Sequence, residues 1–333
     1  MIPSSRFASL IVVTALACGF ATASQASGAG PDPVPGADAG AHLPGTPAIG
    51  DPTLRTRYVE GLGGVPLNVV EAGDPQHRTL IFIHGLGQSH LSWAPQLQSA
   101  LASEFHLVAY DLRGHGNSGK PWRSEDYAAP ATWAGDLERV IRATGARRPL
   151  LVSWSYGTWV AIDYLETHPA SGIAGLVMIG ALGGLAPMMP PAGPAQTARG
   201  KGISERTRSG WLDDNFEAGD EIARFFMRRE ADAAWTRRTA AANALLSPYV
   251  RPLISQRSFD HAREIPRVTV PTWLVLGSED PQAAPASATA LLGRLPEVSL
   301  SVFDGSGHLP FAEDPVRFNR ELAAFARRAF GKE

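Results

Sequence analysis

The stretch at residues 149–165, PLLVSWSYGTWVAIDYL, changes its hydrophobic period abruptly at Ser155. Its first half is a short apolar run of the kind found in strands that are buried on both faces, and beyond Gly157 the apolar residues recur at helical spacing. A strand that turns this sharply into a helix strains the residue at the turn and needs small residues two positions before and after it, here Ser153 and Gly157. The pattern therefore predicts that the Ser155 hydroxyl projects from the edge of a sheet.

The rest of the chain alternates between strand and helix patterns. A hairpin is predicted from 57–60 and 65–71, a helix at 132–144 stopped by Gly145, and a last helix at 315–330. Further strands are predicted at 79–83, 105–110, 173–179, 272–276 and 298–303. Such alternation specifies an α/β fold with a mostly parallel sheet covered by helices on both faces.

Residues 1–23 have the features of an export signal. A single positive charge, Arg6, precedes an apolar core at 7–20, and small residues follow. The apolar core is too short for a transmembrane helix, which needs about 20 residues. We expect cleavage after Ala23 or Ala26 and an exported, periplasmic or secreted protein, with a flexible Ala/Gly/Pro-rich linker over residues 24–52.

The chain has one cysteine, Cys18, and it lies inside this leader. The mature protein is therefore expected to have no disulfide and no thiol nucleophile. An alternative remains open, because residues 15–18, ALAC, resemble a bacterial lipoprotein processing site with the leucine one place late.

Charge and motif content argue against several classes of partner. The formal net charge is −2 over 333 residues and the sequence has no basic stripe, so we expect no nucleic-acid partner. No cysteine or histidine cluster has metal-ligand spacing, and RGHGNSG at 113–119 lacks the third glycine of a dinucleotide-binding loop. We expect neither a metal nor a cofactor, and a small molecule as substrate.

Four motifs each follow an expected strand, namely HGLG at 84–87 followed by Ser92 and Trp93, DLRGHGNS at 111–118, the turn at Ser155, and the late pair LGSED at 276–280 and DGSGH at 304–308. Their combination gives residues 55–330 a resemblance to the α/β-hydrolase family. It implies an eight-stranded, mostly parallel sheet and a chain order of nucleophile, acid and histidine.

The resemblance implies a role for each polar residue. A serine hydroxyl needs a base and the base needs an orienting acid, so Ser155, His308 and Asp280 are the predicted catalytic residues. Glu279 is an alternative acid that family spacing disfavours. The oxyanion-binding groups would be the backbone N–H of Leu86 and of Tyr156, the latter at a helix N-terminus. His84 is interpreted as structural, and His90 as a surface or pocket-mouth residue.

Residues 185–265 interrupt the alternation with apolar residues at helical spacing, which predicts a helical lid over the serine. Trp154 and the lid residues Met188, Phe225 and Phe226 are the predicted substrate-binding wall. An apolar wall would favour apolar acyl groups, with kcat/KM rising with chain length until the pocket is full.

The sequence thus predicts an exported serine hydrolase that cleaves a carboxylic ester or a lactone through an acyl-enzyme. One alternative is a cofactor-free perhydrolase of the haloperoxidase type, which passes the acyl group to peroxide. A C–C bond hydrolase is a second alternative, although residues 84–88 lack the Gly-Pro-Gly run of that class. The third is a binding protein without turnover on the same scaffold.

Overall fold

The computed structural model describes residues 53–187, 194–229 and 233–331. Thr53–Glu333 forms one compact unit, and the predicted leader and linker lie outside the described residues. The strands are β1 (Arg55–Glu60), β2 (Pro66–Ala72), β3 (Thr79–Ile83), β4 (His106–Tyr110), β5 (Leu150–Trp154), β6 (Gly175–Ile179), β7 (Thr272–Gly277) and β8 (Val298–Phe303).

These strands form an eight-stranded sheet in the order β1-β2-β4-β3-β5-β6-β7-β8. The pairs β1·β2 and β2·β4 are antiparallel, and every pair from β4 to β8 is parallel. The expected α/β fold with a mostly parallel, eight-stranded sheet is confirmed. Because β5 lies between β3 and β6, the turn after it stands at the middle of the sheet.

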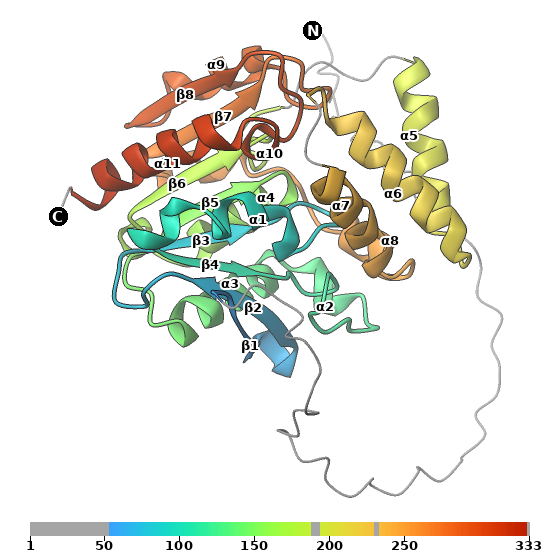
Figure 1. Ribbon diagram of the computed structural model, residues 1–333, viewed down its shortest axis with the longest axis horizontal. Helices are drawn as coiled ribbons and strands as arrows, with labels where there is room; N and C mark the ends of the chain where they lie inside the picture. Colours follow the sequence, from blue (N-terminus) through green and yellow to red (C-terminus); the bar gives the residue numbers. More distant parts are fainter. Residues whose placement is uncertain (1–52, 188–193, 230–232, 332–333) are drawn as a thin grey trace, which may run out of the picture. The chain divides into compact units, whose positions relative to one another are not determined.

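Helices cover both faces of the sheet (Figure 1). The α-helices are α1 (Ala94–Leu97), α2 (Glu125–Ala128), α3 (Pro130–Ala143), α4 (Tyr156–Thr167), α5 (Pro194–Arg206), α6 (Leu212–Phe226), α7 (Ala233–Leu245), α8 (Val250–Ile254), α9 (Pro285–Leu292), α10 (Pro310–Glu313) and α11 (Pro315–Phe330). Short 3-10 helices lie at Leu62–Gly64, His90–Trp93, Ala100–Ser103, Ala170–Gly172 and Ala262–Arg267.

Alternate residues of each central strand enter different cores, as the period of a strand requires. In β3, Ile81 and Ile83 belong to the core that includes residues of α3, α4 and α9, whereas Leu80 and Phe82 belong to the core that includes residues of α1 and α11. Both sets are fully buried, which explains why the strands read as continuous apolar runs rather than alternating ones.

The expected strands at 79–83 and 298–303 and the helix at 315–330 have the bounds that the pattern predicts. The helix expected at 132–144 begins earlier, at Pro130, because proline is favoured in the first turn of a helix, where its missing N–H costs nothing. The strand expected from Ile173 begins at Gly175, because a 3-10 turn at Ala170–Gly172 and a bend at residues 173–174 come before it.

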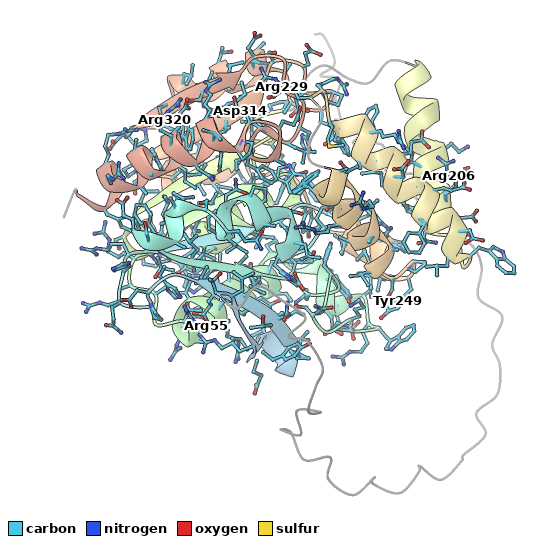
Figure 2. The ribbon with its side chains drawn as sticks, viewed as in Figure 1. Arg55, Arg206, Arg229, Tyr249, Asp314 and Arg320 are labelled. Carbon is cyan, nitrogen blue, oxygen red and sulfur yellow. The ribbon has the colours of Figure 1, made fainter. Side chains whose placement is uncertain are left out.

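The helices α5 to α8 are inserted between β6 and β7 and lie together beside the sheet (Figure 1). Several contacts fasten them to the sheet domain, and two of these are side-chain contacts near the ends of α6 and α7. The buried Trp235 of α7 donates from Nε1 to the Ser92 carbonyl at 3.1 Å. After α6, Arg229 lies against Asp314, with 3.6 Å between Nη1 and Oδ2 (Figure 2). Among the described residues, no helix is both long and apolar enough to cross a bilayer.

Candidate active site

Ser155 occupies the turn between β5 and α4 and has φ 49° and ψ −121°. Among described non-glycine residues, only Ser155 and Arg148 have positive φ. Backbone hydrogen bonds hold this strained conformation, from Ser155 N to Ile179 O at 2.9 Å and from Thr158 N to Ser155 O at 2.9 Å. A Cβ at position 157 would overlap the carbonyl oxygen of Ile83, which explains the requirement for glycine there.

Ser153 stands two residues before Ser155, where the usual G-x-S-x-G pattern of this turn has glycine. Its side chain is buried in β5, and its hydroxyl donates to the Val177 carbonyl of β6 at 2.7 Å. The extra atoms therefore satisfy their own hydrogen bond inside the sheet. This residue leaves the backbone of the turn undisturbed.

The histidine that follows β8 and the acid that follows β7 meet directly. His308 Nδ1 lies 2.8 Å from Asp280 Oδ2, and both side chains are buried. The other carboxylate oxygen, Oδ1, accepts from Gln282 N at 2.8 Å and Ala283 N at 3.2 Å, which fixes the carboxylate. The Glu279 side chain is 59% exposed and lies 3.9 Å from Arg228 Nε instead.

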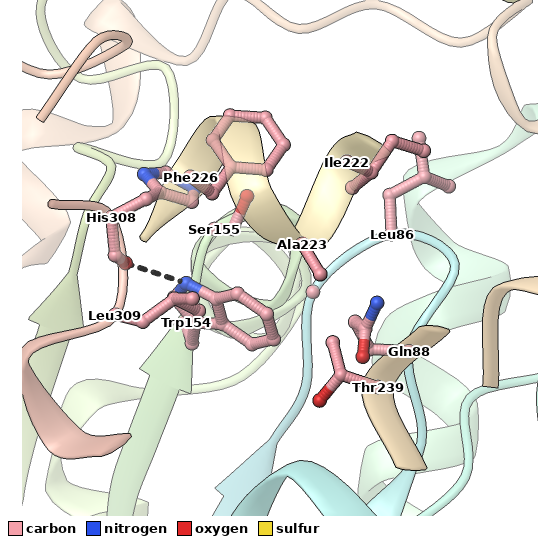
Figure 3. Close-up of a pocket in the computed structure, with 11 residues that line it drawn as sticks. Leu86, Gln88, Trp154, Ser155, Ile222, Ala223, Phe226, Thr239, His308 and Leu309 are labelled. Carbon is pink, nitrogen blue, oxygen red and sulfur yellow. Dashed lines mark hydrogen bonds between the residues drawn. The ribbon is translucent and has the colours of Figure 1, made fainter. Parts of the chain in front are cut away.

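The second ring nitrogen of His308 is left free. With Nδ1 donating to the carboxylate, the neutral ring carries a lone pair on Nε2, and this buried atom has no hydrogen-bond partner among the described residues. His308 and Ser155 line the same pocket (Figure 3). An unpaired imidazole nitrogen beside a strained serine is an arrangement that can remove a hydroxyl proton.

The pocket is small, with a free volume of about 30 Å³. Its lining residues come from the loop after β3, the turn at Ser155, the loop after β8 and the inserted helices, and they are Gly85, Leu86, Gln88, Trp154, Ser155, Ile222, Ala223, Phe226, Thr239, His308 and Leu309. Gly85 packs tightly on the serine, since a Cβ there would lie 3.1 Å from Ser155 Cβ. Leu86 therefore stands next to the place where a substrate carbonyl would sit.

Of the predicted wall, Trp154 and Phe226 line the pocket, but Phe225 does not. Neighbouring helical residues point in different directions, and the Phe225 ring instead packs edge-on against Phe226, with 5.1 Å between centroids. Met188 lies outside the described residues. Ile222 belongs to the apolar lid pattern but was not among the predicted wall residues, and Ala223 was missed, although their spacing to Phe226 places all three on one face of α6.

Phe226 also joins the inserted helices to the histidine. Its carbonyl accepts from His308 N at 2.8 Å, and its ring lies 4.9 Å from the imidazole, centroid to centroid. Buried Glu313 strengthens the connection, because it accepts from Gly307 N at 3.0 Å and, after α6, from Arg228 N at 3.0 Å and Arg229 N at 2.8 Å. The end of α6 and the histidine loop are thus held as one unit.

Tyr156 is the first residue of α4, directly after Ser155. Its side chain turns away from the pocket into the core, where Arg257 Nη1 lies 3.4 Å from the phenol oxygen. The backbone N–H of this residue belongs to the first turn of the helix, where N–H groups have no partner inside the helix. Leu86, in the loop after β3, and Tyr156, in the first turn of α4, thus lie on two different segments next to Ser155.

His84 is a buried structural group. Its Nδ1 donates to the Gly85 carbonyl at 2.8 Å, and its Nε2 accepts from Leu112 N at 2.9 Å. Burial lowers the pKa of this ring to about 4, so it is neutral at pH 7. The two bonds fix the start of the loop that carries Leu86.

The neutral state of His84 predicts acid sensitivity. The pKa of an unfolded histidine is near 6.5 and that of folded His84 is about 4. The neutral ring therefore contributes its full stabilisation, about 3 kcal/mol, above pH 6.5, and this contribution is lost as the pH falls toward 4. We expect Tm to fall over this range more steeply in the wild type than in His84→Asn, measured by calorimetry. Replacing the exposed His77 with Gln should leave the wild-type slope. Parallel slopes for wild type and His84→Asn would refute this assignment.

The loop after β4 is braced by buried charges. Asp111 accepts from His90 Nδ1 at 2.8 Å and from Asn68 Nδ2 at 3.0 Å. Burial, the largest single effect, opposes ionisation of Asp111, but the hydrogen bonds from His90 and the charges of His90 and His84 together outweigh it, and the pKa falls to about 2. Arg113 donates twice to Asp136, both at 2.7 Å. His90 therefore holds the loop and is not one of the residues that line the pocket.

Asp163, Glu166 and His261 lie close enough together to hold a metal ion. However, Arg257 donates to both oxygens of Asp163, one of them at 2.7 Å. The guanidinium already neutralises this buried carboxylate, so these residues do not suit a cation.

The fold and this site define an esterase-like hydrolase, and comparison with known proteins agrees. The chain belongs to the alpha/beta hydrolase family, whose model matches residues 80–321. A solved structure of a candidate aryl esterase from Burkholderia cenocepacia is 34% identical, covering 84% of this chain and 100% of that one, with a TM-score of 0.76.

Two further relatives represent different activities. The esterase RhEst1 from Rhodococcus sp. ECU1013 is 26% identical, covering 81% of this chain and 98% of that one, with a TM-score of 0.70. The non-heme chloroperoxidase CPO-A1 of Kitasatospora aureofaciens is 26% identical over 267 residues, which are 76% of this chain and 94% of the relative.

Proposed function

We propose that the protein hydrolyses a carboxylic ester or lactone through an acyl-enzyme on Ser155. The observation that carries the proposal is that Ser155 and His308 line one pocket, with His308 Nε2 unpaired among the described residues and Nδ1 held by Asp280. His308 takes the hydroxyl proton as Ser155 attacks the carbonyl carbon, and then protonates the leaving alcohol. Water, deprotonated by the same ring, releases the acid and restores the serine.

The negative charge that develops on the carbonyl oxygen needs hydrogen-bond donors. We assign them to the backbone N–H of Leu86 and of Tyr156, which approach from the loop after β3 and the first turn of α4. Asp280 keeps the ring in the tautomer that presents a lone pair to Ser155, and it stabilises the imidazolium during attack. Glu279 points into solvent and takes no part.

The size of the pocket supports a short acyl group, whereas the sequence alone predicts a rate that rises with acyl length until the pocket is full. A free volume of about 30 Å³ is roughly the space of one or two waters, and Phe226 and Ile222 close it from the inserted helices. We expect kcat/KM to be highest for acetyl or propionyl esters and to fall with longer acyl chains. A p-nitrophenyl ester series from acetate to decanoate measures this.

Phe226→Ala should move the optimum to longer chains, raising the ratio of kcat/KM for hexanoate over acetate by about tenfold, equivalent to two methylenes newly accommodated. The ratio is informative because Phe226 also contacts His308, so absolute rates can fall for every ester. Phe216→Ala, at an exposed position of the same helix, serves as the control. A wild-type optimum at octanoate or decanoate would refute the assignment of a short acyl pocket.

The likeness to the chloroperoxidase of Kitasatospora aureofaciens favours one second candidate, acyl transfer to hydrogen peroxide. The same acyl-enzyme would then release a peracid and regenerate the Ser155 hydroxyl. Competition between peroxide and water for a preformed acyl-enzyme distinguishes the two. Peracid formation that outpaces acid formation at millimolar peroxide would favour this candidate.

We also propose that the protein is exported, on the composition of residues 1–23, which lie outside the described part of the chain. The mature N-terminus is then expected at Ser24 or Ser27, which intact mass measures. The protein is expected in the periplasm or the medium, which cell fractionation measures. A diacylglycerol adduct on Cys18 would establish the lipoprotein alternative, and retention of residues 1–20 would contradict cleavage.

A further inference from the structure

Behind the loop that carries Leu86 lies a buried guanidinium, that of Arg251 in α8. The residue is 8% exposed. A Cβ at Gly87 would lie 3.3 Å from both Nη1 and Nη2 of Arg251 and would overlap Asn243 Oδ1, and Gly87 has φ 73°. Glycine is therefore needed at this position for two reasons, its left-handed backbone and the guanidinium packed on it. The turn is closed by Gln88 N donating to Gly85 O at 3.2 Å.

In the part of the chain that the structure describes, Arg251 has no acidic counter-charge. Nη2 donates to the carbonyl and the side-chain oxygen of Asn243 at 3.0 and 3.1 Å, both neutral acceptors. Within the described residues Nε has no hydrogen-bond partner, and no carboxylate lies within ion-pair distance of the guanidinium. Burial and the nearby Arg208 lower the pKa of Arg251 to about 10, so the group stays charged at pH 7.

This is unlike the other buried arginines of the fold. Arg113 is paired with Asp136 and Arg257 with Asp163, each through two hydrogen bonds to the carboxylate. A buried charge without a partner is costly, and proteins usually neutralise it. Among described residues, Arg251 lacks such a carboxylate, and its guanidinium lies next to the loop that faces the substrate. We infer that the site requires a positive potential at this loop.

We propose that Arg251 is a positioning residue for catalysis, which packs the loop of Leu86 through Gly87 and supplies it with unneutralised positive charge that favours the oxyanion. The inference rests on the proposed function. The substrate carbonyl is neutral before attack and anionic afterwards, so a fixed cation in a water-poor site stabilises the later state more. The effect should therefore appear in kcat and hardly in KM.

Two substitutions separate charge from packing. Arg251→Met removes the charge and keeps much of the apolar bulk. Asn243→Asp instead leaves the guanidinium in place and sets a carboxylate against it, at an atom that already accepts its hydrogen bond. We expect both variants to lower kcat for p-nitrophenyl acetate by about tenfold or more with KM changed less than threefold. Arg251→Lys, which keeps the charge, should retain most of kcat.

Thermal unfolding makes the test decisive. Asn243→Asp completes an ion pair, so its Tm should equal or exceed that of wild type even as kcat falls, which a purely structural role for Arg251 does not predict. Arg224→Gln, at an exposed arginine of α6, is the control for loss of a lid charge. If Asn243→Asp keeps full kcat, or Arg251→Lys loses as much as Arg251→Met, the charge has no role and the proposal is overturned. Turnover of p-nitrophenyl acetate by wild type and by Ser155→Ala is measured alongside. Wild-type turnover that does not depend on Ser155 would contradict the proposed function, separately from the role of Arg251.

Discussion

Ser155→Ala is expected to lower kcat for p-nitrophenyl acetate by a factor of about 10³ or more and to leave the fold intact. The reason is that only the attacking oxygen is removed, while the strained turn is held by backbone hydrogen bonds that alanine keeps. Steady-state kinetics with a matched far-UV spectrum and Tm measure both halves of the prediction. The loss of kcat in His308→Ala should be nearly as large.

The two losses should not add in the double variant, because the serine and its base act as a unit. A double variant that falls by the product of the single effects would show that Ser155 and His308 act independently. A Ser155→Ala enzyme that keeps more than a few per cent of wild-type kcat would place the nucleophile elsewhere.

Asp280→Asn should lower kcat by roughly 10³ to 10⁴. The Asp280 carboxylate accepts from His308 Nδ1 at 2.8 Å, and an amide that presents its NH2 group there stabilises the wrong ring tautomer and does not stabilise the imidazolium. Steady-state kinetics on p-nitrophenyl acetate give the magnitude. KM should change little, since Asp280 is not among the residues that line the pocket.

Glu279→Gln is the matched control for Asp280→Asn. It makes the same chemical change one residue earlier in the chain, on a side chain that is 59% exposed and faces Arg228. We expect kcat within about threefold of wild type, the scale of an exposed charge pair. A larger loss for Glu279→Gln than for Asp280→Asn would reassign the acid.

The centre of the sheet could be predicted from the sequence because its strands, β3 to β7, are buried on both faces. Residues 79–83 and 298–303 form strands with the expected bounds, and the helix at 315–330 does so too, since local apolar periodicity dictates each. The turn at Ser155 could also be predicted, because it needs small residues two positions before and after the serine and these are read from the local sequence. The choice of Asp280 over Glu279 needed the family resemblance, and the hydrogen bond to His308 now gives its geometric reason.

Contacts between distant segments could not be predicted in this way. The bond from His308 N to the Phe226 carbonyl joins residues 82 positions apart through backbone atoms, which leave no trace in residue type. Ile222 and Ala223 reach the pocket only because α6 lies over it, and Phe225 is excluded by the rotation of the same helix. The lone charge of Arg251 is likewise visible only once Gly87 and Asn243 are seen beside it.

Covalent trapping of the nucleophile tests the proposed mechanism most directly. The wild-type protein is incubated with a fluorophosphonate, digested, and mapped by tandem mass spectrometry, with Ser155→Ala and Glu279→Gln treated in parallel. We predict a single stoichiometric adduct on Ser155 in the wild type and in Glu279→Gln, and none in Ser155→Ala. An adduct on another residue, or equal labelling of Ser155→Ala, would contradict Ser155 as the nucleophile.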